Sequence, residues 1–392
     1  MALASLPDLG PKPAIKSPWL MLIPLLTIAL VTGMIIGPWS RNIDLGDPWF
    51  ALLCYGNATI WVIILWWASH HLTFQLASMF RKPVPIIDQA SDSFSPVKGI
   101  RFVIAYMTCD DFMEAACLSC LKQRYDSQLF RVLICDDSEK EQSRTVIDHF
   151  VAIHGATAIR RATRHGFKAG NLNNAVFDFT SLEDEWIVVV DADQTLPINY
   201  LDLLANAAAS EPSQTAFIQC AHSSDHILYS EDQIPKPKDL PTAFQIALGN
   251  EIDIFYQRSM PMRNRFGFVP FLGHGAAIRR ASLARTGGLP LLVSEDYAFS
   301  LKLRLNGEWG TYIELISSFE SFPKNFGALV VRLGKFAGGS AELLRSASLE
   351  FFRSEKVSLT EKIDFLMLHL WYPLSTLAFL NSYLSGYVCY RL

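Results

Sequence analysis

The chain has 392 residues, half of them hydrophobic, and a formal net charge of −4. Its apolar content is too high for an ordinary soluble enzyme, and its charge gives no electrostatic basis for binding nucleic acid, so we predict no nucleic-acid partner. The seven cysteines are scattered and odd in number, which fits no disulfide framework and indicates a reduced, cytosolic main domain.

Three apolar runs lie near the ends of the chain, at Trp19 to Trp39, Pro48 to Ser69 and Phe365 to Val388. Each is about long enough to cross roughly 30 Å of hydrocarbon as a helix, which predicts a transmembrane hairpin and, after the middle domain, a third crossing. Asn57 lies inside the second run and is tolerated there if it faces another helix. The polar residues in the third run indicate packing against protein. The alternative for each run is a buried core helix.

Basic residues outside these runs set the orientation. The loop between the first two runs carries only Arg41 against two aspartates, whereas the other flanks are basic. The positive-inside rule therefore places the middle domain in the cytosol. We expect an integral protein of the plasma (inner) membrane. The flanking basic residues are Lys12, Lys16, Arg81, Lys82, Lys356 and Lys362.

From Gly99 onward, short apolar strands alternate with amphipathic helices, which is typical of an α/β domain with a mostly parallel sheet. The predicted strands are Arg101 to Met107, Phe130 to Cys135, Thr157 to Ala162 and Trp186 to Val190. The predicted helices are Met113 to Gln123, Ser143 to His154 and Gly170 to Phe177.

Acidic residues follow two of these strands. Asp136 and Asp137 end one strand, and Asp191 and Asp193 end another, so both pairs are expected at one edge of the sheet, where such sheets bind ligands. Carboxylates there suit a hard cation, Mg²⁺ or Mn²⁺, bridging a diphosphate. The alternative is a turn or helix cap, where aspartate is also common.

The segment from His165 to Asn174, HGFKAGNLNN, combines glycines, Lys168 and Asn171 at a predicted helix start. Glycines permit close backbone approach, and lysine meets phosphate charge. This segment resembles the KAGNLN motif of processive family-2 glycosyltransferases, the group of the cellulose synthase catalytic subunit and hyaluronan synthase. Four further motifs match in the same order: DDS at 136–138, DAD at 191–193, FLGHGAAIRR at 271–280 and SED at 294–296.

The resemblance implies a GT-A-type nucleotide-sugar-binding domain and assigns a role to each motif. Asp137 or its neighbour Asp136 contacts the uracil or ribose of a UDP-sugar, and Lys168, Asn171 and Asp191 belong to the donor site. Asp193, with Asp191, holds the metal. Asp296, beside Glu295, becomes the general base that accepts the proton of a sugar hydroxyl. Direct attack would then invert the anomeric centre and give a β-linkage.

A second triplet, Ser230-Glu231-Asp232, repeats the residues of the base motif. It lies in a loop that contains proline and lysine, whereas Asp296 begins an apolar helical pattern that would hold it at a helix start. We therefore assign the base to Asp296. The Arg160-x-x-x-Arg164 pattern matches a short cyclic-di-GMP-binding sequence, but we interpret it as a solvated basic turn.

The family's QxxRW motif is altered, because its register falls on Arg332, Lys335 and Phe336. Lysine still meets diphosphate charge and phenylalanine still stacks on a sugar, so we keep all three as donor-site residues. Apolar residues recur around them at helical spacing, which predicts an amphipathic helix at the membrane surface; packing on the soluble core is the alternative.

These observations predict a metal-dependent, inverting membrane glycosyltransferase that extends a β-glycan from UDP-glucose. Single transfer onto a lipid or lipid-linked acceptor is the alternative, and a noncatalytic subunit of a synthase complex is a weaker one. Three crossings are few for a polymer channel, so we expect a homo-oligomer, an accessory subunit or a truncated chain. We also expect contact with membrane lipid. The predicted divisions are a tail at 1–17, the hairpin at 18–70, a linker at 71–98, the GT-A domain at 99–322, interfacial helices at 323–362 and a transmembrane helix at 363–392.

Overall fold

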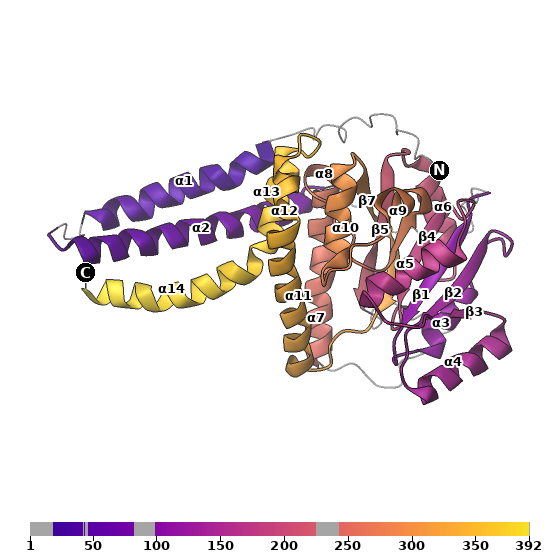
Figure 1. The fold of residues 1–392 in the computed structure, drawn as a ribbon. Coiled ribbons are helices and arrows are strands. Elements are labelled where there is room, and N and C mark those ends of the chain that lie inside the picture. The colour runs from indigo at the N-terminus through magenta and orange to yellow at the C-terminus, as the bar shows by residue number, and fades with distance from the viewer. Residues whose placement is uncertain (1–18, 42, 44–45, 82–98, 225–242, 392) are drawn as a thin grey trace. The chain divides into compact units, whose positions relative to one another are not determined.

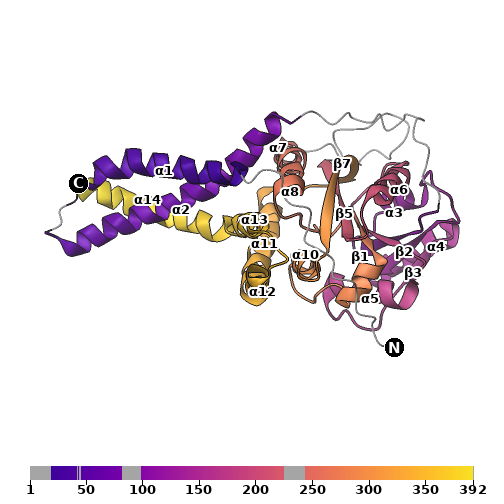
Figure 2. The same cartoon turned by 90° about the horizontal axis from the view of Figure 1, so that it is seen from above.

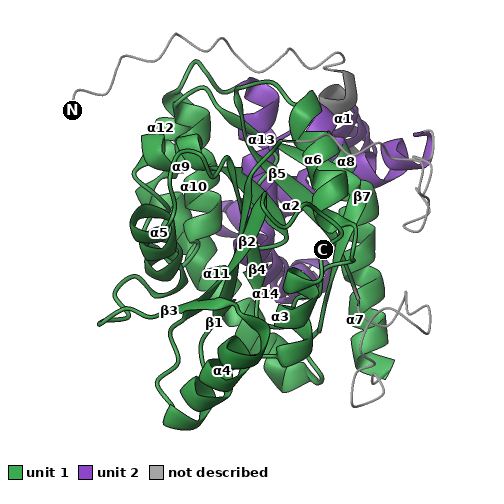
Figure 3. Cartoon of the chain, turned by 90° about the vertical axis from the view of Figure 1, so that its right-hand side faces the viewer, with its two compact units in different colours: residues 1–12, 83–261, 269–357 green, residues 13–82, 262–268, 358–392 purple. Residues whose placement is uncertain are grey.

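The structure is a computed structural model that describes residues 19–41, 43, 46–81, 99–224 and 243–391. The predicted tail and the triplet at 230–232 lie outside these residues. The chain divides into two compact units, coloured separately in Figure 3. Unit 1 contains Pro83–Pro261 and Val269–Val357, and unit 2 contains Pro13–Lys82, Met262–Phe268 and Ser358–Leu392.

Unit 1 is built on a seven-stranded sheet with the strand order β3-β2-β1-β4-β6-β5-β7 (Figure 1). Strands β1 to β4 pair in parallel, as predicted, and β5 pairs in parallel with β7. The short strand β6 runs antiparallel to both β4 and β5, which the sequence pattern did not indicate. The strands are β1 (Phe102–Thr108), β2 (Phe130–Asp136), β3 (Thr157–Ile159), β4 (Trp186–Asp191), β5 (Thr215–Ser224), β6 (Ala276–Arg279) and β7 (Trp309–Glu320).

Helices cover both faces of this sheet (Figure 2). Alternate residues of β1 enter different cores: Val103 and Ala105 pack with residues of α5 and α10, while Ile104 and Tyr106 pack with residues of α3, α4 and α6. A parallel strand buried on both faces reads as a continuous apolar run, and every residue of β1 is buried. These helices are α3 (Glu114–Leu121), α4 (Glu141–His154), α5 (Phe167–Phe179), α6 (Tyr200–Ser210) and α10 (Glu295–Leu305).

All strands and helices predicted between residues 101 and 190 are present, although several begin or end at other residues than predicted. Helix α5 begins at Phe167 rather than Gly170, because Gly166 takes a left-handed conformation that ends the loop there. Strand β3 ends at Ile159, short of the predicted Ala162, since the arginines that follow turn toward β2. The remaining helices of unit 1 are α7 (Ala243–Ile254), η1 (Phe255–Ser259), α9 (Arg280–Thr286), α11 (Phe326–Ser346) and α12 (Ser348–Arg353); α8 (Met260–Phe266) passes from unit 1 into unit 2.

Unit 2 contains α1 (Trp19–Ser40), α2 (Pro48–Met79), α13 (Leu359–His369) and α14 (Trp371–Arg391). Among the described residues, α2 is long and apolar enough to span a membrane, and α13 with α14 qualifies only if the pair, bent by 55°, forms one span. Helix α1 carries a shorter apolar stretch, Ile23–Met34. The three crossings therefore remain a prediction. The predicted linker start at residue 71 is wrong, because α2 continues without a helix breaker to Met79.

Polar side chains inside unit 2 pair with one another. Asn57 of α2 donates to Asn381 of α14 at 3.1 Å, which confirms that it faces another helix. Asp364 lies 3.2 Å from His70 and 3.3 Å from Arg263, and all three side chains are buried. Polar groups in an apolar unit are tolerated when they satisfy each other in this way.

Candidate functional site

The carboxyl ends of β2, β1 and β4 lie side by side at one edge of the sheet. The register pairs Thr108 of β1 with Asp136 on one side and Met107 with Asp191 on the other. Two strands therefore deliver acidic residues to the same edge, as predicted, with only β1 between them.

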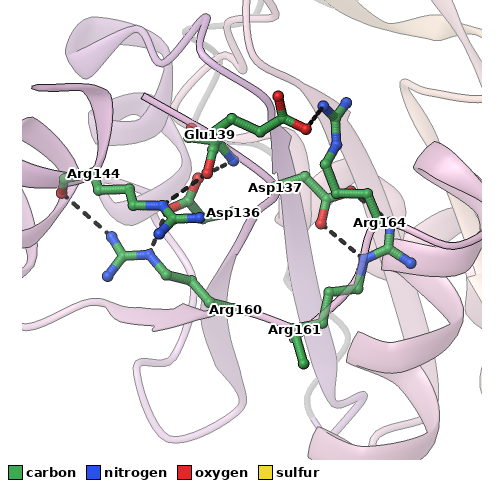
Figure 4. A pocket seen from close by; sticks show the side chains of 9 residues that line it. Asp136, Asp137, Glu139, Arg144, Arg160, Arg161 and Arg164 are labelled. Atoms are coloured by element: carbon green, nitrogen blue, oxygen red, sulfur yellow. Dashed lines mark hydrogen bonds and ion pairs between the residues drawn. The ribbon is translucent and has the colours of Figure 1, made fainter. Parts of the chain in front are cut away.

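Asp136 and Asp137 are both buried and paired with arginines from the loop after β3 (Figure 4). Arg160 Nε donates to Asp136 Oδ2 at 2.6 Å. Arg161 donates to both carboxylate oxygens of Asp137, from Nε at 2.8 Å and from Nη2 at 2.6 Å. The interpretation of this segment as a solvated basic turn is wrong, because these side chains neutralise a buried strand end.

These residues line a cavity of about 240 Å³. Four arginines and three carboxylates line it, so it offers both hydrogen-bond donors and hydrogen-bond acceptors. Arg164 donates to Glu139 at 2.7 Å on its rim. The lining residues are Asp136, Asp137, Ser138, Glu139, Arg144, Arg160, Arg161, Ala162 and Arg164.

A second cavity, of about 460 Å³, shares Asp137 and Arg164 with the first. The structure brings five predicted donor-site residues to its wall: Asp137, Lys168, Asn171, Asp191 and Asp193. The amide of Asn171 also donates to the Cys135 carbonyl at 2.9 Å and so fixes α5 against β2.

Lys168 lies among the acidic groups. Its Nζ is 2.5 Å from Asp191 Oδ1. Burial alone would lower the pKa of Lys168, but Asp191, Glu295 and Asp296 together raise it above its ordinary value. Lys168 is therefore charged at neutral pH, and it connects three motifs that are far apart in the sequence.

The donor set at Asp191 and Asp193 suits a divalent cation. Burial, Asp191 and Glu320 raise the pKa of Asp193 to about 7, although Arg332 opposes this. A neighbouring positive ion stabilises the ionised form of a carboxylate that burial and negative neighbours disfavour. Hard cations in turn prefer carboxylate oxygens as ligands. The residues present therefore fit Mg²⁺ or Mn²⁺.

Glu295 and Asp296 form the first turn of α10, where the helix N-terminus favours negative charge. Burial raises the pKa of Asp296, and repulsion from Glu295 raises it further, to about 7. The loop before β6 closes on this carboxylate: an atom in the Cβ position of Gly273 would lie 3.4 Å from Asp296 Oδ2 and 3.8 Å from Lys168 Nζ. Glycine is needed here, because its φ is +85°.

Helix α11 carries the altered QxxRW positions. Arg332 is half-buried and close enough to Asp193 to lower the pKa of that carboxyl, and its guanidinium lies 5.5 Å from the Phe336 ring centre. Lys335 and Phe336 are exposed. Of the three positions, Arg332 is the one whose charge reaches the acidic edge.

Three further residues near this edge were missed from the sequence. His222 lies two residues before the end of β5, His274 lies in the loop before β6, and Glu320 ends β7. Glu320 Oε2 is 3.7 Å from His274 Nε2 and 3.9 Å from His222 Nδ1. They come from segments without metal-ligand spacing, so only the fold brings them together. Arg161 was also missed, although it lies in the basic segment.

The chain is similar in sequence to known glycosyltransferases. A family model described as glycosyl transferase family group 2 matches residues 186–391, just over half of the chain. The cellulose synthase catalytic subunit (UDP-forming) of Pseudomonas fluorescens is 27% identical over 256 residues, which is 65% of this chain and 32% of that protein. A probable glycosyltransferase of Sulfolobus acidocaldarius is 23% identical over 273 residues, which is 68% of this chain and 55% of that protein. The chain thus spans about a third to a half of these relatives.

Among solved structures, the mannosyltransferase PcManGT from Pyrobaculum calidifontis, in complex with GDP-Man and Mn²⁺, matches with a TM-score of 0.52 at 19% identity. The match covers 79% of this chain and 81% of that one. At this identity the likeness shows the fold: a mixed α/β sheet with flanking helices, as in GT-A glycosyltransferases. Together with the family match, which shows the activity class, this makes the chain a member of glycosyl transferase family group 2, a glycosyltransferase similar to the cellulose synthases.

Proposed function

We propose that the chain is an inverting, metal-dependent membrane enzyme that transfers a sugar from a UDP-sugar to a growing β-glycan. UDP-glucose is the donor that we propose. One observation carries the proposal. Lys168, Asp191, Glu295 and Asp296, from three separate motifs, converge around one lysine ammonium group. This convergence supports a site that combines a cation for the diphosphate with a carboxylate of raised pKa.

The donor half lies in the two connected cavities. The cavity around Lys168 suits the diphosphate, and Asp137 stands between it and the arginine-lined cavity, where a nucleoside would fit. Asp191 and Asp193 would hold Mg²⁺ or Mn²⁺, and a bound ion supplies charge that stabilises the departing diphosphate. Lys168 then donates to the same phosphates, which requires it to leave Asp191.

The acceptor half begins at Asp296. Its carboxylate accepts the proton of the attacking sugar hydroxyl as a new bond forms to the anomeric carbon and the bond to the diphosphate breaks. Burial and repulsion from Glu295 keep the pKa of Asp296 near 7, so that the base is strong enough and is still largely available in its ionised form at cytosolic pH. Attack from the side opposite the diphosphate inverts the anomeric centre.

The membrane assignment draws support from apolar surface. Helix α2 is long and apolar enough to span a bilayer. In unit 1, α11 exposes a set of large apolar side chains, which suits a helix lying at a membrane surface. They are Phe326, Val330, Val331, Leu333 and Phe336.

Single transfer onto a lipid or lipid-linked acceptor is the second candidate. One observation favours it: Lys335, at the position of the family arginine, is exposed. A role as a noncatalytic subunit is disfavoured by the intact cluster around Lys168.

The test is product analysis with the full chain in proteoliposomes. Labelled UDP-glucose, UDP-N-acetylglucosamine and GDP-mannose are supplied separately, with Mg²⁺ or Mn²⁺ and membrane lipid extract. A polymer of β-linked glucose supports the first candidate, and a one-sugar lipid supports the second. An α-linked product would contradict the inverting mechanism, and no transfer from any donor would contradict the proposed function.

A further inference from the structure

His222, His274 and Glu320 form a cluster that the proposed reaction does not use. Nitrogen and oxygen atoms of the three side chains lie within 4.8 Å of one another. The side chains of His222 and Glu320 are 0% and 7% exposed, and that of His274 is 15% exposed. Two imidazoles and a carboxylate are the donors that protein sites offer to Zn²⁺ and related divalent ions.

The separations decide what the cluster suits. Glu320 Oε2 lies 3.9 Å from His222 Nδ1 and 3.7 Å from His274 Nε2. Both distances are too long for hydrogen bonds, which need about 2.7–3.2 Å. Ligand bonds of about 2.0–2.2 Å to one ion, however, hold neighbouring ligand atoms about 3–3.6 Å apart, so each of the two separations from Glu320 lies only a few tenths of an ångström beyond that range.

The surroundings hold the three side chains in this arrangement. His222 stacks on Tyr256 with ring centres 4.7 Å apart and planes 16° apart, and its Nε2 lies 3.2 Å from the Gln219 amide. Ser224 is the register partner of Glu320, so His222, two residues earlier on β5, lies on the same face. His222 Nδ1 is buried and has no hydrogen-bond partner among the described residues. Its charged neighbour is Glu320, at 3.9 Å, and an ion between the two side chains would replace this long ion pair with direct ligand bonds.

We propose that His222, His274 and Glu320 bind a divalent transition-metal ion, such as Zn²⁺, at a site separate from Asp191 and Asp193. The inference goes beyond the proposed function and does not depend on it. The ion would link the ends of β5 and β7 to the loop before β6. Gly273 of that loop lies against the Asp296 carboxylate. The ion would therefore also fix the position of the loop beside the proposed general base.

The test measures metal, not turnover. Purified full-length protein is stripped with a chelator, saturated with Zn²⁺ and dialysed, and its zinc is counted by mass spectrometry. Co²⁺ replaces Zn²⁺ in a parallel series and reports coordination through its visible absorption. The variants are His222→Gln, Glu320→Gln and Asp193→Asn, with His149→Gln, an exposed histidine of α4, as the matched control.

We expect wild type, His149→Gln and Asp193→Asn to keep one tightly bound ion that His222→Gln and Glu320→Gln lack. Zinc should also raise the melting temperature of the first three and leave that of the last two unchanged, which separates loss of the site from misfolding. Wild-type protein without bound zinc, triad variants with undiminished zinc, or loss of the ion from Asp193→Asn as well would each overturn the inference. Failure of sugar transfer would leave these results unaffected.

Discussion

Lys168 Nζ lies 2.5 Å from Asp191 Oδ1, so the amino group that would bind phosphate already holds the carboxylate that would bind a cation. The two positive groups therefore compete for one acid. Binding of a donor diphosphate removes the competition, because phosphate oxygens give Lys168 a new partner and free Asp191. The arrangement would thereby couple the metal affinity of the site to the presence of the donor.

Replacing Lys168 with methionine tests this coupling. Lys168→Met should lower kcat/KM by about 10²–10³-fold, since it removes one preorganised charge from the leaving diphosphate. The same variant should bind Mn²⁺ more tightly than wild type when no nucleotide is present. Calorimetry measures the second effect. Lys302→Met, at an exposed lysine of α10, is the control, and equal Mn²⁺ affinity in Lys168→Met and wild type would contradict the competition.

Asp296→Asn should abolish transfer, with a loss of about 10²–10⁴-fold in kcat, because the amide cannot accept a proton. Binding of the donor should be unchanged. A loss of donor binding equal to the loss of turnover would show that Asp296 has a structural role instead.

The pH dependence follows from the same carboxyl. Burial and Glu295 raise the pKa of Asp296 to about 7, so kcat should fall as the pH drops below 7 and level off above it. For stability the sign is reversed: a raised carboxyl pKa stabilises the fold at low pH, and this stabilisation is lost as the pH rises through 7. Asp296→Asn should therefore melt a few degrees higher than wild type at pH 8 and show no difference at pH 4. A flat kcat profile between pH 5.5 and pH 8 would exclude the assignment.

Arg161 and Asp137 form a buried pair whose side chains are 10% and 5% exposed. Arg161→Met leaves the carboxylate buried and unpaired, which should cost about 3 kcal/mol of unfolding free energy. It should also raise KM for the donor, because Asp137, which Arg161 holds in place, lines both cavities. Arg131→Met removes an ion pair whose arginine is 48% exposed and should cost less than about 1 kcal/mol. Similar losses in the two variants would show that burial of the Arg161 pair has no energetic importance.

Two neighbouring glycines of α11 give a matched comparison. A Cβ on Gly339 would lie 2.1 Å from Ser294 Oγ and 3.2 Å from its Cβ, whereas a Cβ on Gly338 would meet nothing within 4 Å. Gly339→Ala should move the segment that carries Asp296 and lower kcat by about 10-fold, since small misplacements of catalytic groups are costly. Gly338→Ala should leave kcat unchanged. Restoration of kcat by Ser294→Gly in the Gly339→Ala background would confirm the steric cause, and equal effects of the two alanines would contradict it.

Local patterns were enough to predict the first half of the sheet. The strand that became β4 is an uninterrupted apolar run, and acidic residues directly after it identify the ligand edge because parallel strands share that edge. Asp191 and Asp193 could therefore be placed at this edge from the strand pattern, whereas Lys168 was assigned to the same site by the resemblance of its motif. The antiparallel strand β6 has only four residues, too few to show a period.

Contacts between distant segments could not be predicted. Arg161 and Asp137 are 24 residues apart, and nothing in either segment indicates that the guanidinium covers the carboxylate. His222 and Glu320 meet only because β5 and β7 are neighbours in the sheet. Arg332 was assigned by motif register alone, and the electrostatic effect of its guanidinium on Asp193 comes from the packing of α11.

The most direct test of the central claim is release of nucleoside diphosphate from donor sugars by wild-type protein and Asp296→Asn, side by side in proteoliposomes with Mn²⁺. Wild type should release UDP or GDP from at least one donor, with release dependent on both metal and acceptor lipid extract. Asp296→Asn should bind that donor equally well and release at least about 10²-fold less. Equal release by the two proteins, or none from any donor by wild type, would contradict the account.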